Sequence, residues 1–270
     1  MQLQVRGPGH LALASGTAGL GLLCLVYGDF APQWEPVPPW FPWPHAFAYA
    51  SGAVLLAGSI AVLLPRLASR AALALFAYQL VWLAAEAERF PRHATNLALW
   101  LGFGESLAEP LAAAVGCFTL LALLVAEAPA ARLARVGSRG AMRTAEILFG
   151  ASCVGFGLSH FAYADFTASM IPHWLPARTG LVYFTGACHV AAGLALVTNV
   201  IARLAATLEA LMLGAFVVLV HLPSLVSAPE WAPSRQMQGT ELCLALLIAG
   251  SAGVLATSLR NRPWGWGRKR

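Results

Sequence analysis

The sequence predicts an all-α integral membrane protein with eight transmembrane helices, arranged as two parallel four-helix-bundle repeats. Three observations lead to this prediction. Hydrophobic residues make up 59% of the 270 residues and charged residues only 11%, whereas soluble domains carry roughly 25% charged residues. Eight apolar runs are long enough to cross a bilayer, and the last four repeat residues of the first four.

The apolar runs give the expected positions of the spans. A transmembrane helix needs about 20 predominantly apolar residues, and the runs near this length are 11–28, 46–64, 71–88, 97–125, 143–163, 179–199, 204–224 and 239–259. A transmembrane β-strand would alternate polar and apolar residues over about ten positions, and the first run, LALASGTAGLGLLCLVYG, does not alternate. Arg6 precedes this run as in a signal peptide, but the spans that follow favour a retained helix.

The basic residues predict the orientation, because cytoplasmic loops carry an excess of Lys and Arg. If both termini are cytoplasmic, only four of the 17 basic residues lie outside, namely Arg89, Arg92, Arg178 and Arg235. We therefore expect a multi-pass protein of the cell (inner) membrane, with both termini cytoplasmic and the lipid bilayer as its partner. The basic residues lie in short clusters between apolar runs, which argues against nucleic-acid binding despite the formal net charge of +5.

The five cysteines all lie inside apolar runs and show no C-x-x-C spacing: Cys24, Cys117, Cys153, Cys188 and Cys243. This placement is typical of small buried residues and predicts neither a disulfide framework nor a zinc knuckle.

Residues of the first half recur in the second half at a nearly constant offset. Adding 136 takes Gly19, Gly21, Tyr27, Asp29 and Phe30 onto Gly155, Gly157, Tyr163, Asp165 and Phe166, and adding 134 takes Pro38, Trp40, Pro42, Tyr49 and Gly52 onto Pro172, Trp174, Pro176, Tyr183 and Gly186. The expected boundaries are 1–126 for the first repeat, 127–142 for a basic cytoplasmic linker, 143–260 for the second repeat and 261–270 for a basic tail containing tryptophan. Four spans in each repeat give both repeats the same orientation.

The second half also carries a family pattern in residues 157–197, GLSHFAYADFTASMIPHWLPARTGLVYFTGACHVAAGLALV. Its Gly-x-x-His-Phe segment, Pro-x-Trp-Leu-Pro loop and Thr-Gly helix resemble the DoxX/DoxD-like family of four-helix membrane proteins. The resemblance covers residues 143–259 and, through the repeat, residues 11–125. It implies a link to quinone-coupled sulfur oxidation, quinol oxidase complexes or redox-stress assemblies. The chain departs from the family in being a tandem pair and in having His189 where members often carry an acid.

Four ionisable residues, one on each span of the second half, form the candidate site. A charged residue at the centre of a span costs about 2.5–3.5 kcal/mol on insertion scales, so His160, His189, His221 and Glu241 each need an explanation. One polar residue from each helix of a bundle would form a site in its core. In the segment MIPHWLPAR, His173 and Trp174 would lie above this site, and Tyr183 follows on the next helix. The alternative is that these residues only join helices by hydrogen bonds, worth about 0.6 kcal/mol each.

The first repeat lacks this set, because Cys24, Pro39 and Leu55 match His160, His173 and His189. It is acidic instead, and Glu105 matches Glu241. We therefore expect the second repeat to carry the site and the first to support it or to bind a partner. The proline-rich segment VPPWFPWPH, residues 37–45, would lie at the outer surface, because proline breaks helices and tryptophan favours the membrane interface.

Several chemistries could use these side chains. An imidazole beside a carboxylate can bond a quinone oxygen and relay a proton. Haem is disfavoured because only His160 and His221 have comparable depth, and a metal is disfavoured because no closely spaced histidine pair is present. We expect a redox-associated subunit that binds quinone or a similar small lipophile near the outer leaflet.

Two other functions remain open. One is a small-solute or proton-coupled transporter that uses the intramembrane acids Glu86, Glu88, Glu105 and Glu109. The other is a non-catalytic scaffold for an external redox partner. The sequence contains neither C-x-x-C nor a nucleotide-binding glycine motif, so catalysis would be that of a quinone-linked oxidoreductase subunit which needs a partner.

Overall fold

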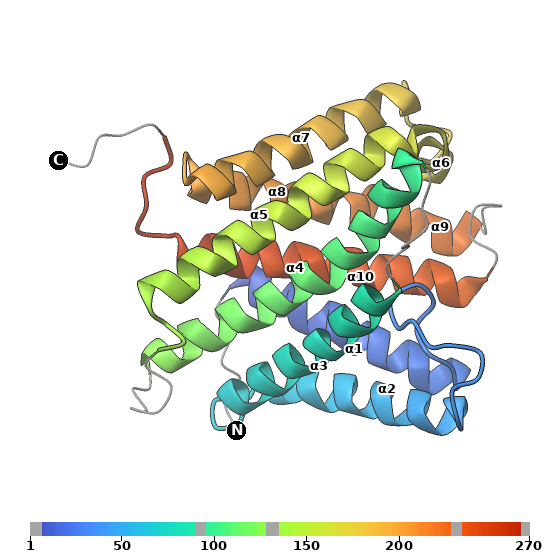
Figure 1. Cartoon of the computed structure of the whole chain (residues 1–270), viewed down its shortest axis with the longest axis horizontal. Helices are drawn as coiled ribbons and strands as arrows, with labels where there is room; N and C mark the ends of the chain where they lie inside the picture. The colour runs from blue at the N-terminus through green and yellow to red at the C-terminus, as the bar shows by residue number, and fades with distance from the viewer. Residues whose placement is uncertain (1–6, 90–95, 128–134, 228–233, 266–270) are drawn as a thin grey trace.

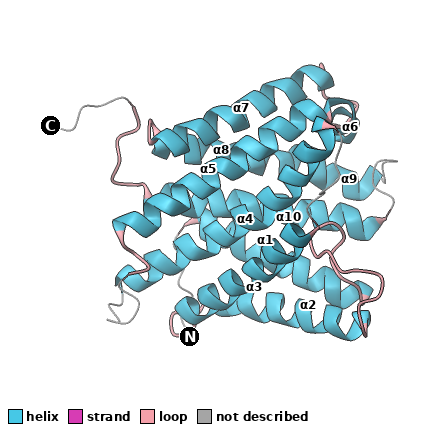
Figure 2. Cartoon of the chain, in the orientation of Figure 1, coloured by secondary structure: helices cyan, strands magenta, loops and turns pink. Residues whose placement is uncertain are grey.

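The computed structural model describes residues 7–89, 96–127, 135–227 and 234–265, and all regular structure within them is helical (Figure 1, Figure 2). The long helices are α1 (Pro8–Tyr27), α2 (Pro44–Ala61), α3 (Ala68–Glu88), α4 (Leu97–Glu127), α5 (Arg139–Ala162), α7 (Arg178–Thr198) and α10 (Arg235–Ser258). One further segment joins α8 (Ala202–Phe216), the π-helical turn η2 (Val217–His221) and α9 (Leu222–Ser227), and α6 (Ala164–Met170) is short. The all-helical prediction is therefore confirmed for the described residues.

Within the described part of the chain, seven helical segments are long and apolar enough to cross a membrane. They are α1, α3, α4, α5, α7, the α8–α9 segment and α10. This finding indicates a multi-pass membrane protein. The remaining long helix, α2, has 18 residues and occupies the place of the expected span 46–64.

Local sequence signals set several helix ends. Pro8 and Pro44 stand in the first turns of α1 and α2, where the missing N–H of proline costs no hydrogen bond. Helix α1 ends at Gly28, which has a left-handed φ of 61° and donates its N–H to Cys24 O. The side chains of Ser138 and Ser234 accept hydrogen bonds from the first turns of α5 and α10, as N-cap residues do.

Helices of the first half of the chain pack against helices of the second half. Helix α1 makes its most extensive contact with α10, and α4 contacts both α3 and α5. Helices α4 and α10 also touch each other and cross the middle of Figure 1, with α1 to α3 on one side and α5, α7 and α8 on the other. The sequence led us to expect two four-helix-bundle repeats, and in the structure helices of the two halves also pack against each other.

Glycines explain how α1 and α10 can lie so close together. A Cβ atom added to Gly16 would overlap the backbone of Leu247, and one added to Gly250 would overlap the backbone of Leu13. Small residues allow such backbone contact, and close van der Waals contact drives helix association in membranes. This packing between the two halves therefore depends on residues that lie more than 200 positions apart.

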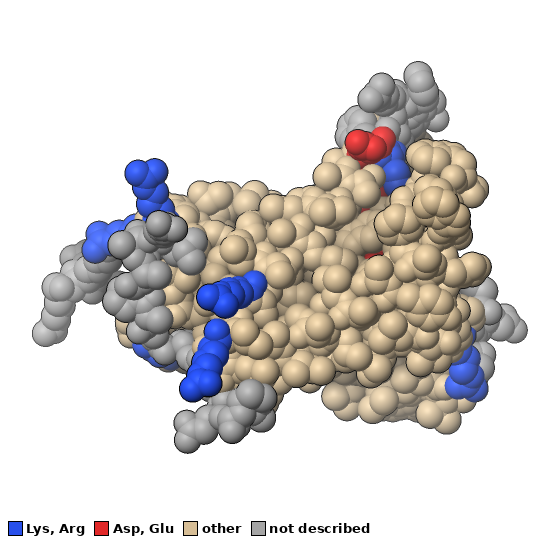
Figure 3. All heavy atoms as spheres, turned by 90° about the horizontal axis from the view of Figure 1, so that it is seen from below, with Lys and Arg blue, Asp and Glu red and all other residues tan. Residues whose placement is uncertain are grey.

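Both termini of the described chain lie at one end of the molecule, on the left of Figure 1, which we call the termini end. Its described basic residues are Arg66, Arg70, Arg135, Arg139, Arg143, Arg203, Arg260 and Arg262, whereas the opposite end, the cavity end, has Arg89, Arg178 and Arg235. Figure 3 shows Lys and Arg toward the two ends, and neither is visible on the surface between them. The expected basic residues Arg6, Arg92, Arg132, Arg268, Lys269 and Arg270, with linker residues 128–134 and tail residues 266–270, lie outside the described residues.

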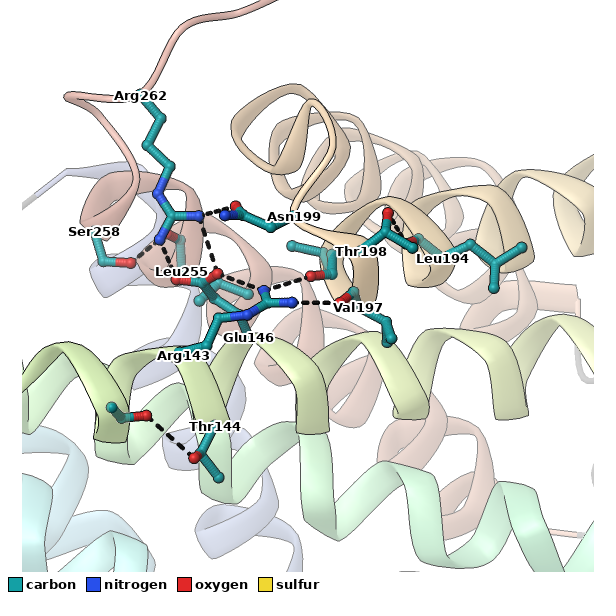
Figure 4. Close-up of polar contacts among 12 residues, drawn as sticks. Arg143, Thr144, Glu146, Leu194, Val197, Thr198, Asn199, Leu255, Ser258 and Arg262 are labelled. Atoms are coloured by element: carbon teal, nitrogen blue, oxygen red, sulfur yellow. Dashed lines mark hydrogen bonds and ion pairs between the residues drawn. The ribbon is translucent and has the colours of Figure 1, made fainter. Parts of the chain in front are cut away.

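A buried ion-pair network fastens the termini end (Figure 4). Glu146 on α5 is 1% exposed and binds Arg143 at 2.9 Å and Arg262 at 2.6 Å. Arg143 also donates to Leu196 O at the end of α7, and Arg262 donates to Asn199 Oδ1. One carboxylate thus links α5, the end of α7 and the segment after α10.

Candidate functional site

A large cavity occupies the half of the molecule toward the cavity end. Its volume is about 2060 Å³, larger than the roughly 300–1,000 Å³ of typical small-molecule pockets. Helices α2, α3, α4, α5, α7 and α10, the α8–η2 segment and the α1–α2 connection all contribute side chains to it. Figure 3 shows a hollow in this part of the molecule with acidic atoms visible inside. The cavity belongs to both halves of the chain, whereas the sequence led us to expect a site in the second half alone.

A buried histidine–carboxylate pair stands where the cavity reaches the middle of the helices. His189 on α7 is 1% exposed, and its Nδ1 lies 2.6 Å from Oε1 of Glu209 on α8. His189 lines the cavity and Glu209 lies behind it. A carboxylate that accepts from one ring nitrogen fixes the tautomer and the orientation of the imidazole. In the neutral imidazole the second nitrogen of His189 is therefore a hydrogen-bond acceptor.

Further aromatic rings pack around His189, among them His160 and Phe216. The His160 ring on α5 lies 5.1 Å from the His189 ring, measured between centroids, and Phe216 packs against both. His160 Nδ1 contacts the backbone carbonyl of Phe156 at 2.9 Å. This contact requires a proton on Nδ1 and leaves the other nitrogen as an acceptor when the ring is neutral. His160 and His189 thus form one imidazole cluster in the cavity wall.

His221 reaches the cavity from the π-helical turn. It is 7% exposed, and its Nδ1 has no hydrogen-bond partner among the described residues. π-Helical turns are rare and occur frequently at functional sites, whereas α3, the matching helix of the first half, is α-helical throughout. A buried imidazole nitrogen without a partner in a cavity wall is available to a ligand.

Carboxylates from the two central helices line the same cavity. Glu105 and Glu109 come from α4 and Glu241 from α10. Glu105 accepts a hydrogen bond from Ser159 Oγ, and the charges of Glu105 and Glu241 both act on Glu109. These carboxylates repel one another when ionised, so a proton or a cation in the cavity stabilises them.

The α1–α2 connection forms another part of the wall, which the sequence did not lead us to expect. Glu35 in this connection is 3% exposed. Its Oε2 accepts the N–H of Ala31 at 2.7 Å and contacts the Cys24 thiol at 3.2 Å, and its Oε1 accepts from the hydroxyls of Ser51 and Tyr78. This carboxylate ties the proline-rich connection to α1, α2 and α3 beside the cavity.

The structure separates the predicted site residues into two groups. His160, His189, His221 and Glu241 all line the cavity. His173 and Trp174 are exposed, and Tyr183 is half-exposed and stacks on Phe161 with 6.0 Å between ring centroids; none of the three is part of the cavity wall. The segment expected to cover the site contributes Met170, Ile171 and Leu175 instead, and the first proline-rich segment contributes far more.

Two functional candidates were missed in the sequence. Glu209 lies within an expected span and so carried the same signal as the histidines, namely an ionisable group in an apolar run. Glu35 had no such signal, because it precedes a proline-rich loop where a carboxylate would be expected to be hydrated. Among the described residues, no group of three or more His, Cys, Asp or Glu side chains is placed to hold a metal ion.

Comparison with known proteins adds one match. A family model described as a domain of unknown function (DUF8561) matches residues 149–256. None of the curated proteins and none of the solved structures compared with the chain matches it. The matched region begins within α5 and ends within α10, and it contains the imidazole cluster, Glu209, His221 and Glu241.

Proposed function

We propose that this chain is a DoxX-like redox-associated membrane subunit that binds a quinone, or a similar small lipophile with a polar head, in the shared cavity. The observation that carries the proposal is the buried His189–Glu209 pair in the wall of a mainly apolar cavity. Apolar walls suit a ring and its hydrocarbon tail, and a few placed polar groups orient the head.

The histidines supply the acid–base chemistry of such a site. His189 accepts a proton from a quinol hydroxyl while Glu209 stabilises the imidazolium that forms. His160 and His221, which also line the cavity, would bond the oxygens of the head. Glu241 and Glu105 provide further positions for protons on the way to the cavity end. Oxidation of a quinol also releases electrons, and these pass to an external redox partner in this proposal.

The proposal includes an architecture of two parallel repeats with eight spans. In its support, α7 begins at Arg178, 134 residues after α2 at Pro44, and α8 begins at Ala202, 134 residues after α3 at Ala68. Trp43 and Ala177, the residues before α2 and α7, have positive φ angles of 47° and 51°.

Matching glycine contacts also support the repeat. A Cβ atom on Gly21 would lie 2.8 Å from the carbonyl oxygen of Gly52, and one on Gly157 would lie 2.5 Å from that of Gly186. These four glycines match one another at the offsets of the predicted repeat.

In the proposed orientation the protein lies in the cell (inner) membrane, and its termini end faces the cytoplasm. The excess of arginine at the termini end supports it. A Ser169→Cys variant should react with a membrane-impermeant maleimide in intact cells, whereas Gly137→Cys should react only after the membrane is opened. Both positions are exposed, at opposite ends, and the parent protein gives the background. The reverse pattern would overturn the orientation.

Quinone retention tests the proposed function. We expect the protein purified in mild detergent to release a quinone on organic extraction, and the His189→Leu and His160→Ala variants to lose most of it. His173→Ala is the matched control, because His173 is exposed and lies outside the cavity wall. Equal retention by all four proteins, at equal folded content, would reject the assignment.

Proton-coupled transport is the second candidate, favoured by the carboxylates of α4 and α10. Intramembrane acids facing a cavity mark proton and substrate paths in transporters. Reconstituted vesicles with an imposed pH gradient would then show solute-dependent proton movement that Glu109→Gln abolishes. If the protein neither retains quinone nor moves protons, the remaining hypothesis is a non-catalytic scaffold for a redox partner.

A further inference from the structure

The first half of the chain lines the cavity with a continuous row of aromatic rings. Phe47 contacts Phe41 at 5.2 Å between ring centroids, Phe41 contacts Phe30 at 5.9 Å, Phe30 contacts Trp82 at 5.7 Å, and Trp82 contacts Tyr78 at 6.2 Å. All five rings line the cavity. They come from the α1–α2 connection, α2 and α3, so this aromatic row is distinct from the imidazole cluster on α5 and α7.

A buried carboxylate stands at one end of the aromatic row. Glu35 accepts hydrogen bonds from the Ala31 N–H and from the hydroxyls of Ser51 and Tyr78. The Cys24 thiol, the fourth group in contact, is also a donor. The Glu35 oxygens therefore act as acceptors in all four contacts. None of these donors carries a charge, and no cationic side chain of the described residues pairs with Glu35.

The other charged side chains of the first half that line the cavity do not neutralise the charge of Glu35. Asp29, Glu86 and Glu88 also line the cavity, with Arg89 as the only basic residue among its described lining side chains apart from the histidines. Arg89 pairs with Glu86 at 3.0 Å. The wall built by the first half therefore carries net negative charge beside aromatic faces, whose quadrupoles are also negative.

We infer that the aromatic row and Glu35 form a binding subsite for an organic cation, an ammonium group carried on an apolar body. Aromatic faces attract such cations at distances up to about 6 Å, and the Glu35 carboxylate supplies the balancing charge. A small hydrated metal ion would gain little from five rings. The apolar remainder of the cavity accommodates the body of the cation.

This subsite goes beyond the proposed function and does not depend on it. The imidazole cluster would hold a quinone head, and the aromatic row would hold an ammonium group in the other part of a cavity larger than one ligand of ordinary size requires. The ammonium group could belong to a soluble amine or to the choline head of a lipid, and the experiment separates these two sources.

The direct test compares a cation with its neutral isostere. Benzyltrimethylammonium and neopentylbenzene have nearly the same shape, and only the first is charged. We expect the full-length protein in phosphatidylglycerol nanodiscs to bind the cation about tenfold more tightly by calorimetry, within the range of desolvated cation–π contacts. Equal affinities would overturn the inference, even if quinone retention is intact.

Two variants locate the site. Glu35→Gln keeps an acceptor for the hydroxyls of Ser51 and Tyr78 but removes the charge, and Trp82→Leu removes a ring from the row. Each should reduce cation affinity about tenfold, whereas Trp82→Phe should retain most of it. Phe76→Leu is the matched control, because Phe76 is also on α3 but packs on Phe118 away from the cavity. Unchanged binding in folded Trp82→Leu and Glu35→Gln proteins would overturn the assignment.

The lipid composition identifies the source of the cation. If choline heads occupy the subsite, benzyltrimethylammonium should bind several-fold more weakly in phosphatidylcholine nanodiscs than in phosphatidylglycerol nanodiscs. If the ligand is a soluble amine, the two affinities should agree once the surface charge of the lipid is screened by salt. In either case the affinity for benzyltrimethylammonium should fall in the Glu35→Gln variant. If the parent and Glu35→Gln proteins bind it equally well in both lipids, the inference is wrong.

Discussion

The His189–Glu209 pair allows a prediction in which two disruptive substitutions compensate each other. By the predicted repeat, at the offset of 134, Leu55 matches His189 and Leu75 matches Glu209. Both leucines are fully buried in the first half, at 0% and 1% exposure. The double variant His189→Leu/Glu209→Leu therefore copies the two buried leucines that stand at the matching positions of the first half.

The magnitudes follow from what each variant leaves behind. His189→Leu leaves the buried Glu209 carboxylate without its partner, and breaking a buried pair in this way costs about 3–5 kcal/mol. Glu209→Leu leaves a buried neutral imidazole without its acceptor, which costs about 1–3 kcal/mol. The double variant removes both polar groups, and apolar replacement of a buried pair is often neutral or stabilising. We expect it to be about 5 kcal/mol more stable than the sum of the single variants predicts.

The measurement is a double-mutant cycle on the free energy of unfolding in mixed micelles, with denaturing detergent as the titrant. The coupling energy is the departure of the double variant from additivity. Additive losses would refute the reasoning, because they would mean that the two side chains do not interact in the folded protein. The same double variant should lose bound quinone while remaining stable, which separates the role of the pair in function from its role in folding.

Three further predictions concern the fold. Gly250→Ala should cost about 1–3 kcal/mol because its Cβ overlaps the Leu13 backbone, whereas Gly104→Ala, with open space around it, should be neutral or slightly stabilising by thermal unfolding. Glu146→Ala should cost about 2 kcal/mol, less than a fully buried pair because its arginines are partly exposed; an unchanged unfolding temperature would show that the network is not stabilising. Ser138→Ala should cost about 1 kcal/mol through loss of the N-cap of α5, and Ser138→Asp should restore the parent stability in the same assay.

The sequence predicted the helices well because the bilayer imposes a simple rule. A segment that crosses hydrocarbon must satisfy its backbone internally and present an apolar surface, so each span leaves a continuous apolar run. Each of the eight expected runs falls largely within a helix, for example 143–163 in α5 and 179–199 in α7, and seven helical segments of the described residues are long and apolar enough to cross a membrane.

The sequence contains no comparable signal for which helices pack against each other. It depends on which small residues meet, and the meeting of Gly16 with Leu247 cannot be read from either segment alone. The sequence-based expectation therefore kept the four helices of each half together, whereas α1 and α10 pack across the halves.

The site was predictable to the extent that its residues lie within spans. His160, His189 and His221 stand out because an ionisable group in an apolar run is costly. The sequence could not show that acids of the first half face the same cavity, because this requires the packing of the halves against each other. Glu35 could not be predicted for a different reason. A loop carboxylate is ordinarily hydrated, and only the fold buries Glu35, which is itself part of the proline-rich connection.

The two walls of the cavity differ in a way that constrains the ligand. The glycines that bring α1 to α2 and α5 to α7 match at the repeat offsets, so the two halves share their close helix contacts. The side chains of the cavity wall do not match at these offsets: Leu55, which is not part of the wall, has the repeat position of His189, and Trp82 has that of Phe216. The π-helical turn in the second half adds one residue to its helix, so beyond it the offset becomes 135 and His221 matches Glu86, and both line the cavity.

A symmetric ligand would meet an imidazole cluster on one side and a carboxylate with aromatic rings on the other, and it would use only one of them well. The cavity therefore suits either one ligand with two chemically different ends or two different ligands bound together. Competition distinguishes these cases: benzyltrimethylammonium should displace the quinone if one molecule occupies both walls, and the two should bind simultaneously if each wall has its own ligand.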